Sequence, residues 1–167
     1  MKGFIRLKYS IKHISINQIL AWIPVLLIMG TIFYLSHQPA SDSSKLSGSV
    51  TELIAQMITA IPILQIDMDK FHFFIRKSAH FLAYLTLGFF VMNAVQISFR
   101  KAIFKLIRYR ISFALLVCIL YAISDEVHQL FIPGRSGEVG DVLIDSAGAF
   151  VGIGIYHFVI RKIKNRK

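Results

Sequence analysis

Charged residues are scarce in this sequence, and their scarcity argues against an ordinary soluble domain. Only 17% of the 167 residues are Asp, Glu, Lys or Arg, whereas 55% are hydrophobic. A soluble domain of this size carries roughly a quarter charged residues. The deficit therefore predicts membrane-spanning segments, and the length suits one compact domain covering residues 1–167.

Cysteine is nearly absent as well. The single thiol, Cys118, lies inside an apolar run and has no partner for an intrachain disulfide. The fold therefore does not depend on such a bond.

Acidic residues are missing from the three segments in which Lys and Arg are concentrated. Residues 1–17, 100–110 and 161–167 hold most of the basic residues and none of the nine acidic ones. Blocks of this kind beside apolar runs follow the positive-inside rule and place both termini in the cytoplasm of a bacterial cell. The net charge of +10 does not indicate nucleic acid, because no basic face interleaved with aromatic residues accompanies it.

Long apolar runs between these basic segments predict an all-α, polytopic membrane protein. The first run is interpreted as an uncleaved span rather than a signal peptide, because no small-x-small cleavage site follows it. Four transmembrane helices are expected, at about residues 19–36, 73–99, 111–132 and 139–160.

The connection between the first two spans predicts one further helix. Apolar residues from Leu46 to Ile61 recur at helical spacing, and the helix should end near Pro62. We expect it to be amphipathic and to lie on the outer membrane surface. Packing against the bundle instead of the lipid is an equally open alternative.

Polar residues collect at the ends of three different spans. The predicted topology brings these ends to one depth, in the outer part of the membrane, where ionisable groups are expensive and usually have a function or a partner. The residues concerned are Arg76, Lys77, His80 and Tyr84 in the second span, Asp125, Glu126 and Gln129 in the third, Arg135 in the turn, and Asp141 and Asp145 in the fourth.

These residue types suggest roles around an anionic ligand. Guanidinium and ammonium groups suit a phosphate or carboxylate, which assigns Arg76, Lys77 and Arg135 to binding. We assign proton transfer, as hypothetical catalytic residues, to His80, Asp125 and Glu126. Tyr84, Gln129, Asp141 and Asp145 complete the ligand-binding set.

Two other readings of the cluster remain open. A divalent cation would also suit its carboxylates, although no HExxH spacing is present, and Asp141 with Asp145 would then hold the metal. Alternatively, Arg76 and Arg135 pair with the aspartates and only pin the bundle together.

Three stretches of the sequence resemble the VanZ-like family of small bacterial membrane proteins. These are SHQP after the first span, RKSAHFLAYLTLG at the second, and YAISDEVHQLFIPGRSGEVGDVLIDSAGAFVG across the third and fourth. The resemblance implies an association with low-level resistance to teicoplanin-type glycopeptide antibiotics, and it supplies no mechanism. His128 ranks below Gln129, because variety is expected at its position. The matching positions are Arg76, Lys77, His80, Tyr84, Asp125, Glu126, Gln129, Pro133, Gly134, Arg135, Asp141, Asp145 and Gly148.

Our leading hypothesis is a site at the outer membrane face that binds or modifies an anionic headgroup of a cell-envelope lipid. The alternative is a non-catalytic protein that masks a lipid-linked cell-wall precursor. A small transporter is a weaker alternative, because no charged track continues inward past Gly88 or Gly148. A phosphatidic-acid-type phosphatase is rejected, because the sequence has no PSGH-like stretch.

Overall fold

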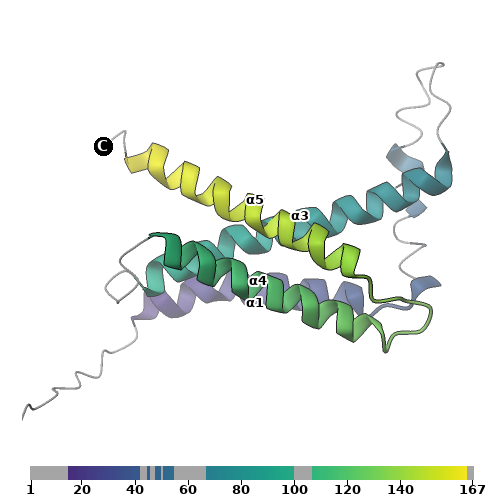
Figure 1. Cartoon of the computed structure of the whole chain (residues 1–167), viewed down its shortest axis with the longest axis horizontal. Coiled ribbons are helices and arrows are strands. Elements are labelled where there is room, and N and C mark those ends of the chain that lie inside the picture. The colour runs from purple at the N-terminus through teal and green to yellow at the C-terminus, as the bar shows by residue number, and fades with distance from the viewer. Residues whose placement is uncertain are drawn as a thin grey trace, which may run out of the picture.

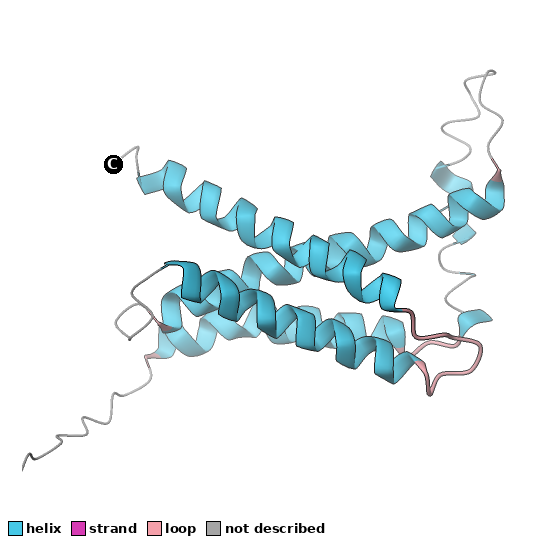
Figure 2. Cartoon of the chain, viewed as in Figure 1, coloured by secondary structure: helices cyan, strands magenta, loops and turns pink. Residues whose placement is uncertain are grey.

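The regular structure of the chain is helical. The structure, a computed structural model, describes residues 15–41, 45, 48–49, 51–54, 67–99 and 107–164, and no strand occurs among them. The helices are α1 (Ile16–Ser36), α3 (Met68–Ser98), α4 (Ile107–Gln129) and α5 (Val139–Lys164), as Figures 1 and 2 show. All four contain stretches long and apolar enough to cross a bilayer, which confirms the all-α, multi-pass membrane fold.

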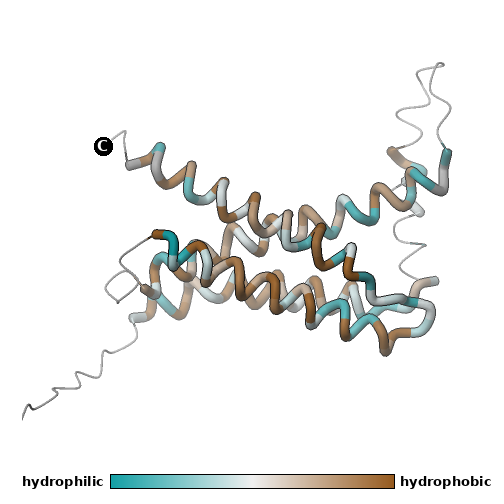
Figure 3. The backbone as a smooth tube through the Cα atoms, in the orientation of Figure 1, coloured by the Kyte–Doolittle hydropathy of each residue, from teal (hydrophilic) through white to brown (hydrophobic). Residues whose placement is uncertain are grey.

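The four helices alternate in direction, so each end of the bundle gathers distant parts of the chain. At one end, Gln18 of α1 donates a hydrogen bond to the Ser98 carbonyl at 2.9 Å, and Arg110 of α4 donates to the Phe99 carbonyl at 3.2 Å. At the other end lie the C-termini of α1 and α4 and the N-termini of α3 and α5 (Figure 1). The polar stretches of three spans therefore meet at one end, which Figure 3 shows as hydrophilic colour near that end of the helices.

Glycines set the distance between α3 and α5. A Cβ atom built on Gly152 would lie 2.8 Å from the Leu85 carbonyl carbon, and one on Gly88 would lie 2.8 Å from the Ala149 Cα. Real Cβ atoms essentially never approach backbone this closely, so only glycine fits at these positions. The small-xxx-small pair at Gly148 and Gly152 thus has the function that its spacing predicts. We call these backbone contacts, made by Gly88, Gly148 and Gly152, the glycine seam.

Side chains near the seam form the core, and the outer surface is apolar. Tyr84, Leu87 and Val91 of α3 are fully buried. Large apolar side chains such as Leu26 and Leu143, both about two-thirds exposed, face outward. An apolar exterior of this kind suits a helix bundle that is solvated by lipid.

Several helix boundaries differ from the expected ones by a few residues, and those of α3 and α4 bear on the site. α4 ends at Gln129, before Ile132, because the amides of Phe131 and Ile132 bond three residues back, at 3.0 Å each, and tighten the last turn. α3 begins at Met68 and has 31 residues, so it is about 46 Å long. This exceeds the ~30 Å hydrocarbon core, and its first turns extend beyond the neighbouring helices in Figure 1.

The amphipathic helix expected between Leu46 and Ile61 lies mostly outside the described residues. Residues 51–54 are described and are helical. Thr51 is buried.

Candidate functional site

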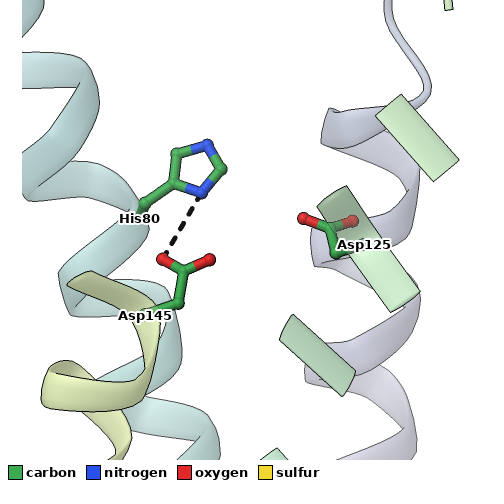
Figure 4. A group of neighbouring side chains, drawn as sticks. All are labelled: His80, Asp125 and Asp145. Carbon is green, nitrogen blue, oxygen red and sulfur yellow. Dashed lines mark ion pairs between the residues drawn. The ribbon is translucent and has the colours of Figure 1, made fainter. Parts of the chain in front are cut away.

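Three side chains from three helices meet near the polar end of the bundle. They are His80 of α3, Asp125 of α4 and Asp145 of α5, and each offers one ligand-type atom within 4.8 Å of the others. Figure 4 shows the two carboxylates and the imidazole turned toward one space. His80 Nδ1 lies 3.6 Å from Asp145 Oδ1.

The glycine seam explains why α3 and α5 bring their site residues together. Gly148 lies about one turn after Asp145, and Phe81 follows His80 directly. A Cβ atom on Gly148 would lie 3.1 Å from the Phe81 carbonyl carbon, so the helix backbones are in contact beside the site. This contact holds Asp145 opposite His80.

Asp125 is oriented by two polar neighbours. Ser36, the last residue of α1, donates its hydroxyl to Asp125 Oδ2 at 2.9 Å, and Gln129 Nε2 lies 3.3 Å from the same oxygen. Gln129 was predicted from the sequence, whereas Ser36 was not assigned to the site. The signal for Ser36 was its place in the SHQP stretch at the end of a span, where a buried hydroxyl can reach a neighbouring helix.

Glu126 connects α4 to the loop that precedes α5. Its Oε2 atom accepts the backbone N–H of Glu138 at 2.8 Å. This bond satisfies an amide at the start of α5, where helix N–H groups lack partners within the helix. Glu126 is thus engaged in holding the loop, and its assignment to proton transfer stays a prediction.

Lys77 is held by carboxylates. Its ammonium group forms ion pairs with Asp141 and, at 3.2 Å, with Glu138. The Lys77 and Asp141 side chains are only 11% and 9% exposed, whereas Glu138 is 47% exposed. The hydrogen bond from Lys77 lowers the pKa of Glu138 below its ordinary value. Lys77 therefore neutralises acids at the start of α5. Its ammonium group is already paired, so its predicted role in ligand binding stays a prediction.

Arg135 binds backbone carbonyls at the end of α1. Its Nε donates to the Gln38 carbonyl at 2.9 Å, and its Nη2 donates to the Leu35 carbonyl at 3.0 Å. These carbonyls lack partners within the helix, and cationic side chains commonly satisfy such groups. Burial lowers the pKa of Arg135, and the positive charge of Arg76 nearby lowers it further. Two like charges are thus held close together.

Arg76 differs from the other two cations. Within the described part of the chain, its side chain takes part in no hydrogen bond or ion pair, and it is exposed. Arg76 and Arg135 line the same cavity of about 50 Å³, together with His80, Gln129, Asp141, Ala40, Gly134 and Ser136. A water molecule needs about 10–15 Å³ by a comparable measure, so the cavity has room for a phosphate- or carboxylate-sized group.

Tyr84 and His128 lie outside this cavity lining. Tyr84 is fully buried one turn below His80, and its hydroxyl has no hydrogen-bond partner among the described residues. His128 stacks on Phe33 with ring centroids 4.6 Å apart, and its Nε2 lies 3.1 Å from His37 Nδ1. The structure therefore offers no contact between Tyr84 or His128 and a ligand in the cavity.

A family model described as VanZ/LLP1 matches residues 21–161. The match covers α3 and α4 completely, all of the site described above, and most of α1 and α5. No curated protein and no solved structure gave a significant match.

Proposed function

The chain belongs to the VanZ/LLP1 family. We propose, from the geometry of its polar site, that it binds an anionic headgroup of a cell-envelope lipid. The headgroup would enter the cavity between Arg76 and Arg135. Modification of the headgroup by the neighbouring His80, Asp125 and Glu126 is the second step of the same proposal. The family's link to glycopeptide resistance makes a lipid-linked cell-wall precursor one headgroup to test.

The observation that carries this proposal is the pair of arginines on one small cavity. Placing two guanidinium groups together is unfavourable without an anion between them. Arg135 is anchored by carbonyls, whereas Arg76 forms no hydrogen bond or ion pair among the described residues. After the larger effect of the hydrogen bond from Lys77, the charge of Arg76 also lowers the pKa of Glu138. An arginine offers a planar set of N–H donors that matches phosphate or carboxylate oxygens. The arrangement thus favours an anion that Arg76 would clasp from one side.

Binding of a headgroup is tested with the purified protein in detergent micelles. We expect Arg76→Ala to weaken binding of anionic bacterial lipids and lipid-linked precursors roughly tenfold or more, because hydrogen bonds to a charged group contribute about 1.5–3 kcal/mol. Arg108→Ala is the matched control, because Arg108 lies at the opposite end of the bundle and its guanidinium contacts only Tyr109 among the contacts described. Equal binding by the Arg76 variant and the wild type would refute the proposal.

Mass spectrometry of the same incubations distinguishes an enzyme that modifies the headgroup from a protein that only binds it. A changed headgroup that requires His80 or Asp125 would identify an enzyme. Stoichiometric binding without a product would identify a protein that masks its lipid. Reduced access of glycopeptide antibiotics to a masked precursor would then account for resistance.

We further propose that the site faces outward from the cytoplasmic membrane, with both termini in the cytoplasm. The basic residues before α1, from the α3–α4 connection into the first turn of α4, and from the last turn of α5 onward support this orientation. The single cysteine makes a direct test possible. After Cys118→Ser, a membrane-impermeant thiol reagent should label Ser136→Cys in intact cells. It should label Lys162→Cys, at the other end of α5, only after permeabilisation. The reverse pattern would place the site inside.

A further inference from the structure

Two buried carboxylates of the site carry oxygens without a hydrogen-bond donor among the described residues, and the only ion pair of either with a described residue is that of Asp145 with His80 at 3.6 Å. Asp145 is 0% exposed and neither of its oxygens accepts a hydrogen bond, and Asp125 is 3% exposed with Oδ1 likewise without a donor among the described residues. A buried polar group almost always has a partner, and an exception points to an ion or water. The carboxylates of Asp125 and Asp145 face the same space (Figure 4), which therefore indicates that an ion or a water molecule binds between them.

We propose that His80, Asp125 and Asp145 bind one divalent transition-metal ion of the zinc class. Binding of the ion does not depend on the headgroup, because the metal ligands come from the protein alone, although His80 and Asp125 also belong to the proposed modification step. It also differs from the pair suggested by the sequence, since Asp141 is committed to Lys77. His80 and Asp125 come from the other two helices of the site instead.

The geometry suits a metal with three protein ligands. Zinc bonds of about 2.0–2.2 Å place tetrahedral ligand atoms roughly 3.3–3.6 Å apart. His80 Nδ1 and Asp145 Oδ1 are already 3.6 Å apart, and all three ligand atoms lie within 4.8 Å. The widest spacing must shorten by roughly 1 Å when a zinc ion binds.

The charges around the site leave room for a cation. The Lys77 ammonium is paired with Asp141 and Glu138, and the Arg135 guanidinium donates to carbonyls. A protonated His80 would neutralise only one of the two carboxylates, and removing an unpaired charge from water is costly. A divalent ion would neutralise both.

The neighbours of Asp125 resemble the outer hydrogen bonds of a metal site. Ser36 and Gln129 both bond to Oδ2, which leaves Oδ1 without a partner among the described residues. Carboxylates that bind metals are commonly oriented by such hydrogen bonds. Ser36 and Gln129 would therefore position the ligand without touching the metal.

The donor set selects the class of ion. One imidazole and two carboxylates suit zinc, cobalt or manganese, whereas calcium and magnesium prefer oxygen ligands throughout. Three protein ligands leave a coordination position open, which is the pattern of catalytic rather than structural zinc sites. His80 also lines the cavity with Arg76 and Arg135, so the ion would lie at the wall of the proposed headgroup pocket.

The test is a titration of chelator-treated protein, purified with an affinity tag free of histidine, with Co²⁺ followed by visible absorption. We expect one ion per chain in the wild type. His80→Gln and Asp145→Asn should weaken binding roughly 100-fold or more, because even outer hydrogen-bond partners change metal affinity about 10–100-fold. His128→Gln and Asp67→Asn are matched controls outside the cluster and should bind Co²⁺ as the wild type does.

Two results would overturn the metal site. One is a wild type that binds no stoichiometric Co²⁺, and the other is wild-type affinity in His80→Gln and Asp145→Asn. If those variants aggregate, Ser36→Ala decides, because it removes only the hydroxyl that orients Asp125 and should weaken Co²⁺ binding about tenfold; unchanged affinity would then refute the site. Arg76→Ala should keep the metal, so failure of the headgroup proposal is distinguishable from failure of this one.

Discussion

Gly152→Leu is expected to abolish the folded bundle, and Gly152→Ala to destabilise it by about 1–3 kcal/mol. The added Cβ would meet the backbone of Leu85 on α3, with the carbonyl carbon only 2.8 Å away. Backbone atoms of a helix cannot rotate aside as a side chain does, so α3 and α5 must separate. Denaturant unfolding in detergent, followed by the fluorescence of the single Trp22, measures the effect.

Gly154→Ala is the matched control for this loss. Gly154 lies on the same helix, and a Cβ atom there has nothing within 4 Å. The substitution should leave stability unchanged or raise it slightly, because Ala favours a helix more than Gly does. Equal stability of the Gly152→Ala and Gly154→Ala proteins would contradict the close approach of α3 and α5.

Lys77→Met is expected to destabilise the protein by about 3–5 kcal/mol. The substitution keeps the apolar stem of the side chain and removes the ammonium group. Asp141, only 9% exposed, would be left as a buried carboxylate without its cation. Breaking a buried pair on one side costs far more than the pair itself contributes. The same unfolding measurement applies.

A double substitution isolates the cause. Lys77→Met combined with Asp141→Leu should recover much of the lost stability, since no uncompensated charge then remains. Glu138→Gln should cost less than about 1 kcal/mol, because the Glu138 side chain is 47% exposed and solvent-exposed pairs contribute little. Double and single variants of equal stability would show that Lys77 stabilises the bundle by something other than its pair with Asp141.

The sequence predicts the parts of this fold that depend on one segment at a time. Apolar length gives the spans, and Pro133-Gly134 marks the break after α4, where Gly134 adopts a φ of +76°. The alternation of basic segments predicts that the polar span ends share one depth. Each of these features is local, or follows from counting crossings of the membrane.

The sequence alone could not predict which individual side chains pair with each other. Helical spacing states which residues share a face of one helix, but it leaves open the rotation and axial shift of one helix against another. Those are set by backbone contacts such as Gly148 against Phe81. For this reason Lys77, which the sequence assigned to a ligand, is found with Asp141 and Glu138, and Ser36 was not assigned to the site at all.

Arg135, in the loop after α4, is a second residue whose partners the sequence did not predict. The sequence weighed an anionic ligand against an aspartate partner, and the guanidinium instead donates to the carbonyls of Leu35 and Gln38. Backbone acceptors at a helix end are invisible to a reading based on side-chain charge. Arg76 remains the cation best placed for a ligand.

The glycine seam also divides the site into a part that tolerates change and a part that does not. His80 and Asp145 stand on α3 and α5, whose backbones touch, so alteration of the seam would displace both residues together. Ala40 and Ser136 line the same cavity from the segments after α1 and α4, away from the seam and without the hydrogen bonds that Gln129 and Arg135 make there. Redesign of ligand preference should therefore start from that wall and treat α3 and α5 as one rigid frame.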